Sequence, residues 1–206
     1  MISIAIAFAG VLLTLTPITE FLDSTLALHM VAQHFVFVAA GFLFAYGVNS
    51  MIWVRSKLSI SVCRVYNSMQ TFNSWVNRRG LAAFVAAGIL IAYWYFPSNF
   101  DAAVISERIH VVMHLTFLLA GSLIYGGAKM LPKRTQRIAP IVVGKTMGLA
   151  GVLLLLTTMQ LYTVYPLAQQ VDAGVVLVFA MLILDFTLVP LWLYNYFGRP
   201  LGSERN

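Results

Sequence analysis

The sequence predicts an all-α integral membrane protein with six transmembrane helices, and composition, segment length and charge pattern support this. Of its 206 residues, 60% are hydrophobic and 10% are charged, whereas soluble domains have about 45–50% apolar and about 25% charged residues. The apolar residues gather in segments that approach or exceed the roughly 20 residues a membrane span needs. Little remains for a soluble domain, so we expect one polytopic membrane domain over residues 1–206, embedded in lipid.

Six segments have the hydropathy of membrane spans. They cover approximately residues 2–19, 27–52, 81–97, 108–130, 139–165 and 172–197. The first has neither the basic start nor the cleavage site of a secretory signal peptide, so we interpret it as a span. The last two would form a hairpin over about residues 139–198.

The charged residues predict which way these spans run. Basic residues fall in or near the connection between the second and third spans, in or near the connection between the fourth and fifth, and in the tail: Arg55, Lys57, Arg64, Arg78, Arg79, Lys129, Lys133, Arg134, Arg137, Lys145, Arg199 and Arg205. The positive-inside rule makes these regions cytoplasmic, so both termini should lie on the cytoplasmic side of the cell membrane. The net charge of +6 therefore reflects inner loops, and we expect no nucleic-acid partner.

The inner loop over about residues 55–80 has a helical pattern of its own. Apolar residues recur there at alternating spacings of four and three: Leu58, Val62, Val65, Met69, Phe72 and Val76. This pattern predicts one amphipathic helix at the inner membrane surface or on the bundle. The single Cys63 rules out a disulfide within the chain.

An internal repeat relates about residues 1–50 to about 81–130. Pro17 matches Pro97, and the equivalent pairs further along, at the same offset, include His34 with His114 and Gly41 with Gly121. The first two spans therefore look like a helical hairpin that the next two repeat in the same orientation. Such repeats are related by an axis along the membrane normal.

All four histidines lie in two equivalent segments of this repeat, "HMVAQHFVFVAAG" (29–41) and "IHVVMHLTFLLAG" (109–121). Met30 with His34, and His110 with His114, are four residues apart and so share a helix face. At about 100° per residue, His29 should point roughly 140° away from His34. We expect His34 and His114 to face each other near the outer membrane surface, with Met30 and His110 one turn above.

Histidine is the commonest metal ligand, and a thioether suits copper(I). The pattern therefore favours a copper site formed by His34, His110 and His114 with Met30, and with Met113 or His29 as a further ligand. Two alternatives remain. His34 and His114 could be the axial ligands of a haem b, or the histidines could only form hydrogen bonds between helices.

The segment "HMVAQHFVFVAAGFLFAYG" resembles the histidine motif of the CtaG-type cytochrome c oxidase assembly factors, and "IHVVMHLTFLLAGSLIYG" is similar to their second motif. The resemblance extends from the start of the chain to about Met130 and implies a multispanning protein linked to copper delivery to a haem-copper oxidase. His29, His34, His110 and His114 match its motif positions. It implies that subunits of a membrane oxidoreductase are partners. A permanent subunit of a respiratory oxidase or copper monooxygenase complex is the alternative.

Two further charges fall inside predicted spans. At a rise of about 1.5 Å per residue, Lys145 in the fifth span and Asp185 in the sixth come to similar depths. We expect an ion pair because an unpaired charge there is costly; the alternative is a proton path through Asp185.

The chain carries no nucleotide fingerprint, phosphate loop or serine nucleophile motif, so we expect an accessory protein rather than an enzyme.

Overall fold

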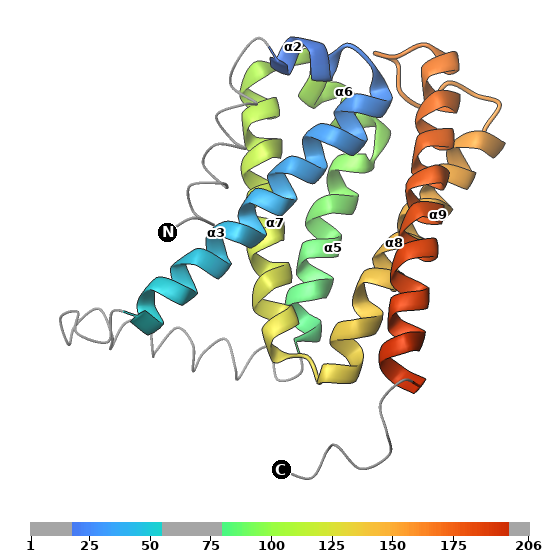
Figure 1. Cartoon of the computed structure of the whole chain (residues 1–206). Coiled ribbons are helices and arrows are strands. Elements are labelled where there is room, and N and C mark those ends of the chain that lie inside the picture. The colour runs from blue at the N-terminus through green and yellow to red at the C-terminus, as the bar shows by residue number, and fades with distance from the viewer. Residues whose placement is uncertain (1–17, 55–79, 198–206) are drawn as a thin grey trace, which may run out of the picture.

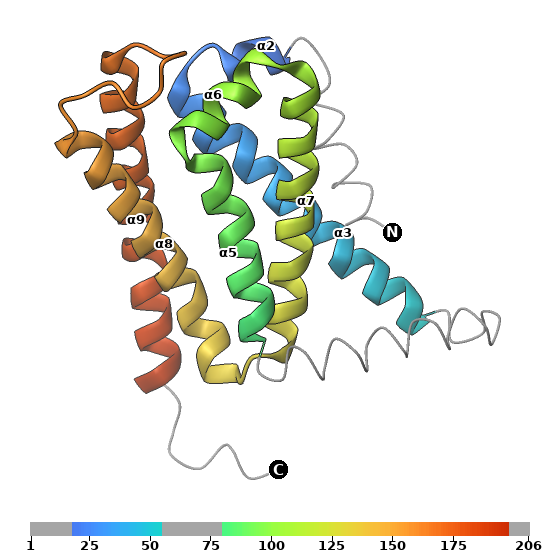
Figure 2. The ribbon, with the colours of Figure 1, turned by 180° about the vertical axis from the view of Figure 1, so that it is seen from behind.

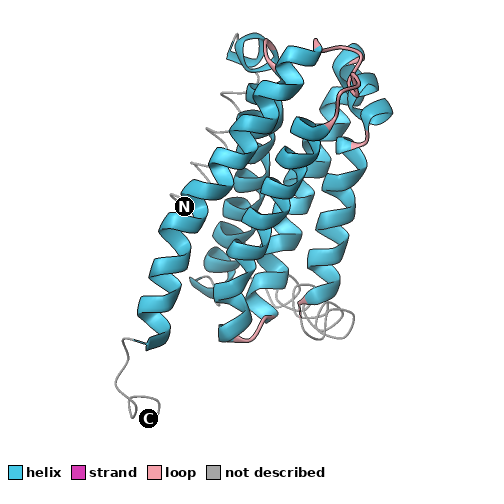
Figure 3. Cartoon of the chain, turned by 90° about the vertical axis from the view of Figure 1, so that its right-hand side faces the viewer, coloured by secondary structure: helices cyan, strands magenta, loops and turns pink. Residues whose placement is uncertain are grey.

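The computed structural model describes residues 18–54 and 80–197, and every regular element in these ranges is a helix (Figure 3). The prediction of an all-helical chain is therefore confirmed for the described residues. Nearly all of the predicted first span and of the amphipathic inner-loop helix lies outside them.

The first described part of the chain consists of α2 (Ile18–Asp23), the π-helix η1 (Leu28–Gln33) and α3 (His34–Val54). In a π-helix the backbone hydrogen bonds run between residues five apart, and such turns are frequent at functional sites. The continuous helix Leu28–Ser50 is long and apolar enough to cross a membrane. The short helix α2 precedes it at one end of the bundle (Figure 1).

The second part contains α5 (Leu81–Tyr95), α6 (Pro97–Ile105) and α7 (Glu107–Met130). Phe96 separates α5 from α6 with extended backbone angles, because a residue that precedes proline disfavours the helical conformation. Pro97 then begins α6, where its missing N–H costs no hydrogen bond. The axes of α5 and α6 differ by 69°, so the chain bends sharply where the predicted third span ends.

The third part is a hairpin of α8 (Lys133–Leu156) and α9 (Leu167–Phe197). The sequence predicted a fifth span over about 139–165 and a sixth from about residue 172. The structure ends α8 at Leu156 and begins α9 at Leu167, so residues 157–166 form a non-helical connection. Polar side chains fix this connection, as described below, and hydropathy alone does not detect such contacts.

Three described helices are long and apolar enough to span a membrane, or four if the bent pair α5–α6 counts as one span. The helices α2 and α6 and the connection 157–166 lie together at one end of the bundle in two opposite views (Figures 1 and 2). We call this the histidine end, because His29, His34, His110 and His114 belong to the helix segments that begin there.

Helices α3 and α7 cross with their backbones in contact, and glycine makes this possible. A Cβ atom on Gly41 would overlap the carbonyl oxygen of Leu118, and a Cβ atom on Gly121 would overlap that of Val38. The two contacts involve equivalent positions of the internal repeat. The close crossing therefore fixes how the first residues of α3 and α7 face each other.

Candidate metal centre

The four histidine side chains gather into one cluster at the histidine end. The ring centroids lie 5.0 Å apart for His29 and His34, 5.1 Å for His29 and His110, and 4.3 Å for His110 and His114. His29 comes from η1 and His34 begins α3, whereas His110 and His114 lie one turn apart on α7. The two equivalent segments of the repeat thus supply the whole cluster.

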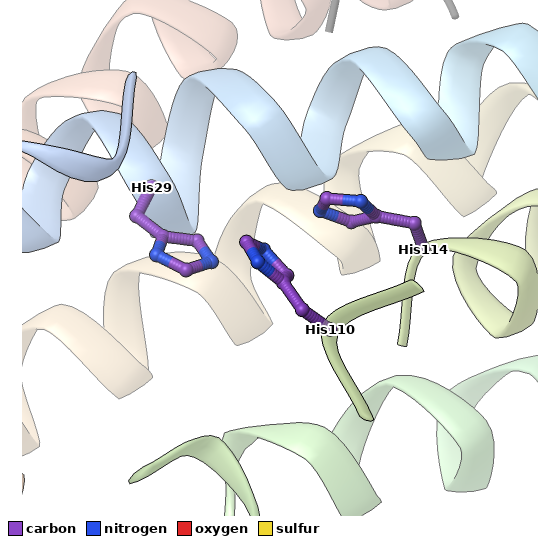
Figure 4. A group of neighbouring side chains, drawn as sticks. All are labelled: His29, His110 and His114. Carbon is purple, nitrogen blue, oxygen red and sulfur yellow. The ribbon is translucent and has the colours of Figure 1, made fainter. Parts of the chain in front are cut away.

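Three of these side chains are placed to share one ion. His29, His110 and His114 each offer a ring nitrogen, and these nitrogens all lie within 4.8 Å of one another. Figure 4 shows the three rings converging on the space between η1 and α7. His29 is fully buried and the other two are half-buried.

The Nε2 atoms of the four histidines share an unusual environment. Each is buried, and none has a hydrogen-bond partner among the described residues. A buried polar atom without a partner costs roughly 1–3 kcal/mol, so four in one place form an unfavourable arrangement for a packing cluster. The same atoms are suited to donate lone pairs to a metal.

The position of His29 corrects the prediction that it points well away from His34. The predicted angle assumed an α-helix, whereas residues 28–33 form a π-helix. Residues five apart align more closely in a π-helix because its hydrogen bonds run from residue i to residue i+5. The wider turn therefore brings His29 beside His34 and into the cluster.

His34 and His114 both belong to the cluster, and each ring packs on an aromatic side chain. The His34 ring lies 4.3 Å from the Phe117 ring, and the His114 ring stacks on Phe37 at 3.9 Å. Each histidine thus packs on a phenylalanine of the other helix, again at equivalent positions of the repeat. Phe37 and Phe117 are buried and form the inner wall of the site.

Two tyrosine hydroxyls contact the Nδ1 atoms on the far side of the rings. His29 Nδ1 lies 3.0 Å from the Tyr165 hydroxyl, and His34 Nδ1 lies 3.2 Å from the Tyr95 hydroxyl. The Tyr165 hydroxyl donates to the carbonyl of Asp23, and the Tyr95 hydroxyl donates to the carbonyl of Met30. The Asp23 carboxylate also lies 3.4 Å from His29 Nδ1.

The two methionines considered as ligands lie in apolar surroundings. Met30 packs in a buried cluster with Leu26, Phe100 and Leu154. Met113 packs in a second buried cluster that contains Phe37 and Phe117. Their packing gives both thioethers a clear role in the hydrophobic core.

The connection 157–166 reaches the site through Tyr165, which contacts His29. Asp101 Oδ2 accepts hydrogen bonds from the backbone N–H and the hydroxyl of Thr163, at 2.8 and 2.7 Å. Gln160 donates to the carbonyls of Tyr162 and Tyr165. Burial and the nearby Asp101 raise the pKa of Tyr162 to about 12, so it stays a neutral donor. These bonds hold Tyr165 against His29.

Lys145 and Asp185 form an ion pair between α8 and α9. This contact lies in the hairpin that contributes no histidine. The Asp185 side chain is 19% exposed and that of Lys145 57% exposed. The pair therefore links the two helices of the hairpin and stands apart from the histidine cluster.

Sequence reasoning did not assign Tyr95 or Tyr165 to the site. Tyr95 is 61 positions from His34, and Tyr165 is 136 positions from His29. Neither tyrosine belongs to the histidine motifs or to a helix face shared with them. No sequence signal short of the tertiary contacts themselves identifies them.

Comparison with known protein families gives a match that covers most of the chain. Residues 4–195 match the family described as "Protein of unknown function (DUF1404)". The chain matches no curated protein and no solved structure.

Proposed function

We propose that this chain, which belongs to the DUF1404 family, is a membrane protein that binds one copper ion through its histidine cluster. Its role would be that of an accessory or assembly protein for a copper-containing membrane oxidoreductase. The observation that carries the proposal is the set of four buried Nε2 atoms without hydrogen-bond partners among the described residues.

The spacing of the nitrogens supports one shared ion. Histidine nitrogens bind zinc at about 2.0–2.1 Å, and copper–imidazole bonds are of similar length, so two ligands of one ion lie at most about 4 Å apart. The nitrogens of His29, His110 and His114 lie within 4.8 Å of one another before any ion is bound. Small ring rotations would complete a three-histidine site, and His34 would be a fourth ligand.

The ligand type narrows the choice of metal. Imidazole suits zinc, copper, iron and nickel, and among divalent ions copper binds most tightly to a given nitrogen site. The resemblance of both histidine segments to the CtaG-type assembly factors also favours copper. Partners would then be subunits of the oxidoreductase that receives or shares the metal.

The close crossing of α3 and α7 favours an ion over a haem. A porphyrin between His34 and His114 needs the two helices apart, yet Gly41 and Gly121 let their backbones touch only about two turns away. The phenylalanine rings of Phe37 and Phe117 also occupy the space beside these histidines. A haem with these axial ligands would require both helices to move.

In the proposed topology six spans cross the cell membrane and both termini lie inside. The charge pattern supports this orientation, because Lys129 and the basic residues after it follow the end of α7 opposite the histidine end. The histidine cluster would open toward the outer face. Asp23, which is 28% exposed beside His29, would attract cations there.

Metal analysis of the natively purified protein tests this function. All four histidines of the chain lie in the cluster, so the protein should be purified through a tag that contains no histidine. We expect about one copper per chain and no Soret absorption band. A Soret band with stoichiometric iron would instead identify a b-type haem protein. A metal-free protein that co-purifies in a fixed ratio with an oxidase, whose activity survives loss of the histidines, would identify a structural subunit.

A further inference from the structure

The hydroxyls of Tyr95 and Tyr165 each touch two groups, a histidine Nδ1 and a backbone carbonyl. Tyr165 lies 3.0 Å from His29 Nδ1 and 3.0 Å from the carbonyl oxygen of Asp23. Tyr95 lies 3.2 Å from His34 Nδ1 and 3.0 Å from the carbonyl oxygen of Met30. The two contacts have the same form although the tyrosines come from different parts of the chain.

The direction of these hydrogen bonds follows from the number of protons. A carbonyl oxygen can only accept, and a tyrosine hydroxyl has one proton to donate. Because each hydroxyl donates its proton to a carbonyl, its oxygen must accept the second bond from Nδ1–H. A neutral imidazole with its proton on Nδ1 has a free lone pair on Nε2.

We propose that Tyr95 and Tyr165 are positioning residues that hold His34 and His29 in the Nδ1–H tautomer. Their Nε2 lone pairs are thereby directed into the histidine cluster before any metal arrives. The effect on metal affinity rests on the proposed function, whereas the tautomer itself is a property of the metal-free protein. Outer partners of this kind fix ligand tautomers and orientation in metal sites.

The surroundings hold both tyrosines in place. Tyr95 is the last residue of α5, immediately before the bend at Phe96, and its carbonyl accepts a hydrogen bond from the Tyr162 hydroxyl. Tyr165 belongs to the connection that Asp101 and Gln160 fix. Helix α5 and the connection between α8 and α9 thus position ligands that η1 and α3 supply.

The Asp23 carboxylate favours the same tautomer at His29. It lies 3.4 Å from His29 Nδ1, on the side of the ring opposite Nε2, where it attracts a proton on Nδ1. For His34 the hydroxyl of Tyr95 is the partner of Nδ1. Loss of the tyrosine hydroxyl should therefore affect His34 more than His29.

Nitrogen NMR of the metal-free protein labelled with ¹⁵N-histidine tests the proposal. The chain has four histidines, so the spectrum contains only eight ring nitrogens. For His29 and His34 we expect a protonated, pyrrole-type Nδ1 and an unprotonated, pyridine-type Nε2. Tyr95→Phe should change the two signals of His34, and Tyr165→Phe those of His29. Tyr93→Phe is the matched control, because Tyr93 lies on α5 two residues before Tyr95 and its side chain is 56% exposed, and it should leave all eight signals in place.

Copper titration of the same variants measures how much the tyrosine hydroxyls contribute to metal affinity. Tyr95→Phe and Tyr165→Phe should each weaken copper binding by about 10- to 100-fold at unchanged stoichiometry. A protonated Nε2 on His29 and His34 in the unmodified protein would overturn the proposal, even if a phenylalanine variant failed to fold. Unchanged histidine signals in both variants would also overturn it. If the tautomers are as expected and no metal binds, the proposed function fails and the positioning role of the tyrosines stands.

Discussion

At the scale of single residues, the candidate site is defined by buried imidazole nitrogens without hydrogen-bond partners among the described residues. Burying a polar atom without a partner is unfavourable, and here four equivalent atoms are buried together. Phenylalanine rings pack on His34 and His114. Tyrosine hydroxyls contact the Nδ1 atoms of His29 and His34. The four Nε2 atoms have no such partner among the described residues and are available to a ligand.

Met30 provides a test at this scale. The thioether suits copper(I), and its spacing from His34 suggested a ligand, yet Met30 packs among Leu26, Phe100 and Leu154. Met30→Leu preserves volume and apolarity, so we expect a loss of less than about 1.5 kcal/mol in unfolding free energy. Copper stoichiometry, measured by metal analysis, should not change. A loss of bound copper in a folded Met30→Leu protein would make the thioether a ligand.

At the scale of elements, the crossing of α3 and α7 and the π-helix η1 place the histidines. The sequence was sufficient to find all four, because the i, i+4 spacing and the internal repeat are readable without a structure. The internal repeat also marks Gly41 and Gly121 as equivalent positions, and both lie where α3 and α7 cross. Sequence reasoning missed the position of His29, because no hydropathy pattern distinguishes a π-helical turn from an α-helical one. It missed Tyr95 and Tyr165 because only tertiary structure brings them near.

Glycine substitutions test the helix crossing. A Cβ atom at Gly41 meets the backbone of Leu118, which cannot move alone, whereas a Cβ atom at Gly88 of α5 meets nothing within 4 Å. We expect Gly41→Ala to lower the unfolding free energy by about 1–3 kcal/mol through overpacking. Gly88→Ala should be neutral or slightly stabilising, since alanine favours helix. Thermal unfolding in detergent measures both, and equal stability of the two variants would contradict the crossing.

At the scale of the whole molecule, the bundle gathers its irregular parts at one end. The bend between α5 and α6, the π-helix η1 and the connection 157–166 all lie at the histidine end (Figures 1 and 2). Non-helical backbone is tolerated in membrane proteins where it lies at the surface or is covered by protein. This end is therefore where an ion-binding site is most easily accommodated.

Labelling of single cysteines tests the proposed orientation. In a Cys63→Ser background, a cysteine in place of Met159, which is 74% exposed in the connection 157–166, should react with a membrane-impermeant maleimide added outside cells. A cysteine in place of Pro132, between α7 and α8, should react only after the membrane is opened. The reverse pattern would place the histidine end in the cytoplasm and contradict the topology.

The central claim is that the histidine cluster binds a metal ion, and copper titration of a three-histidine variant tests it most directly. The variant carries His29→Gln, His110→Gln and His114→Gln. It lacks the three imidazoles whose nitrogens converge but keeps polar side chains at these positions. Met30→Leu serves as the control. We predict that the unmodified protein and the control each bind about one copper per chain and that the three-histidine variant, still folded by circular dichroism, binds none. Equal copper binding by the folded variant and the unmodified protein would contradict the account.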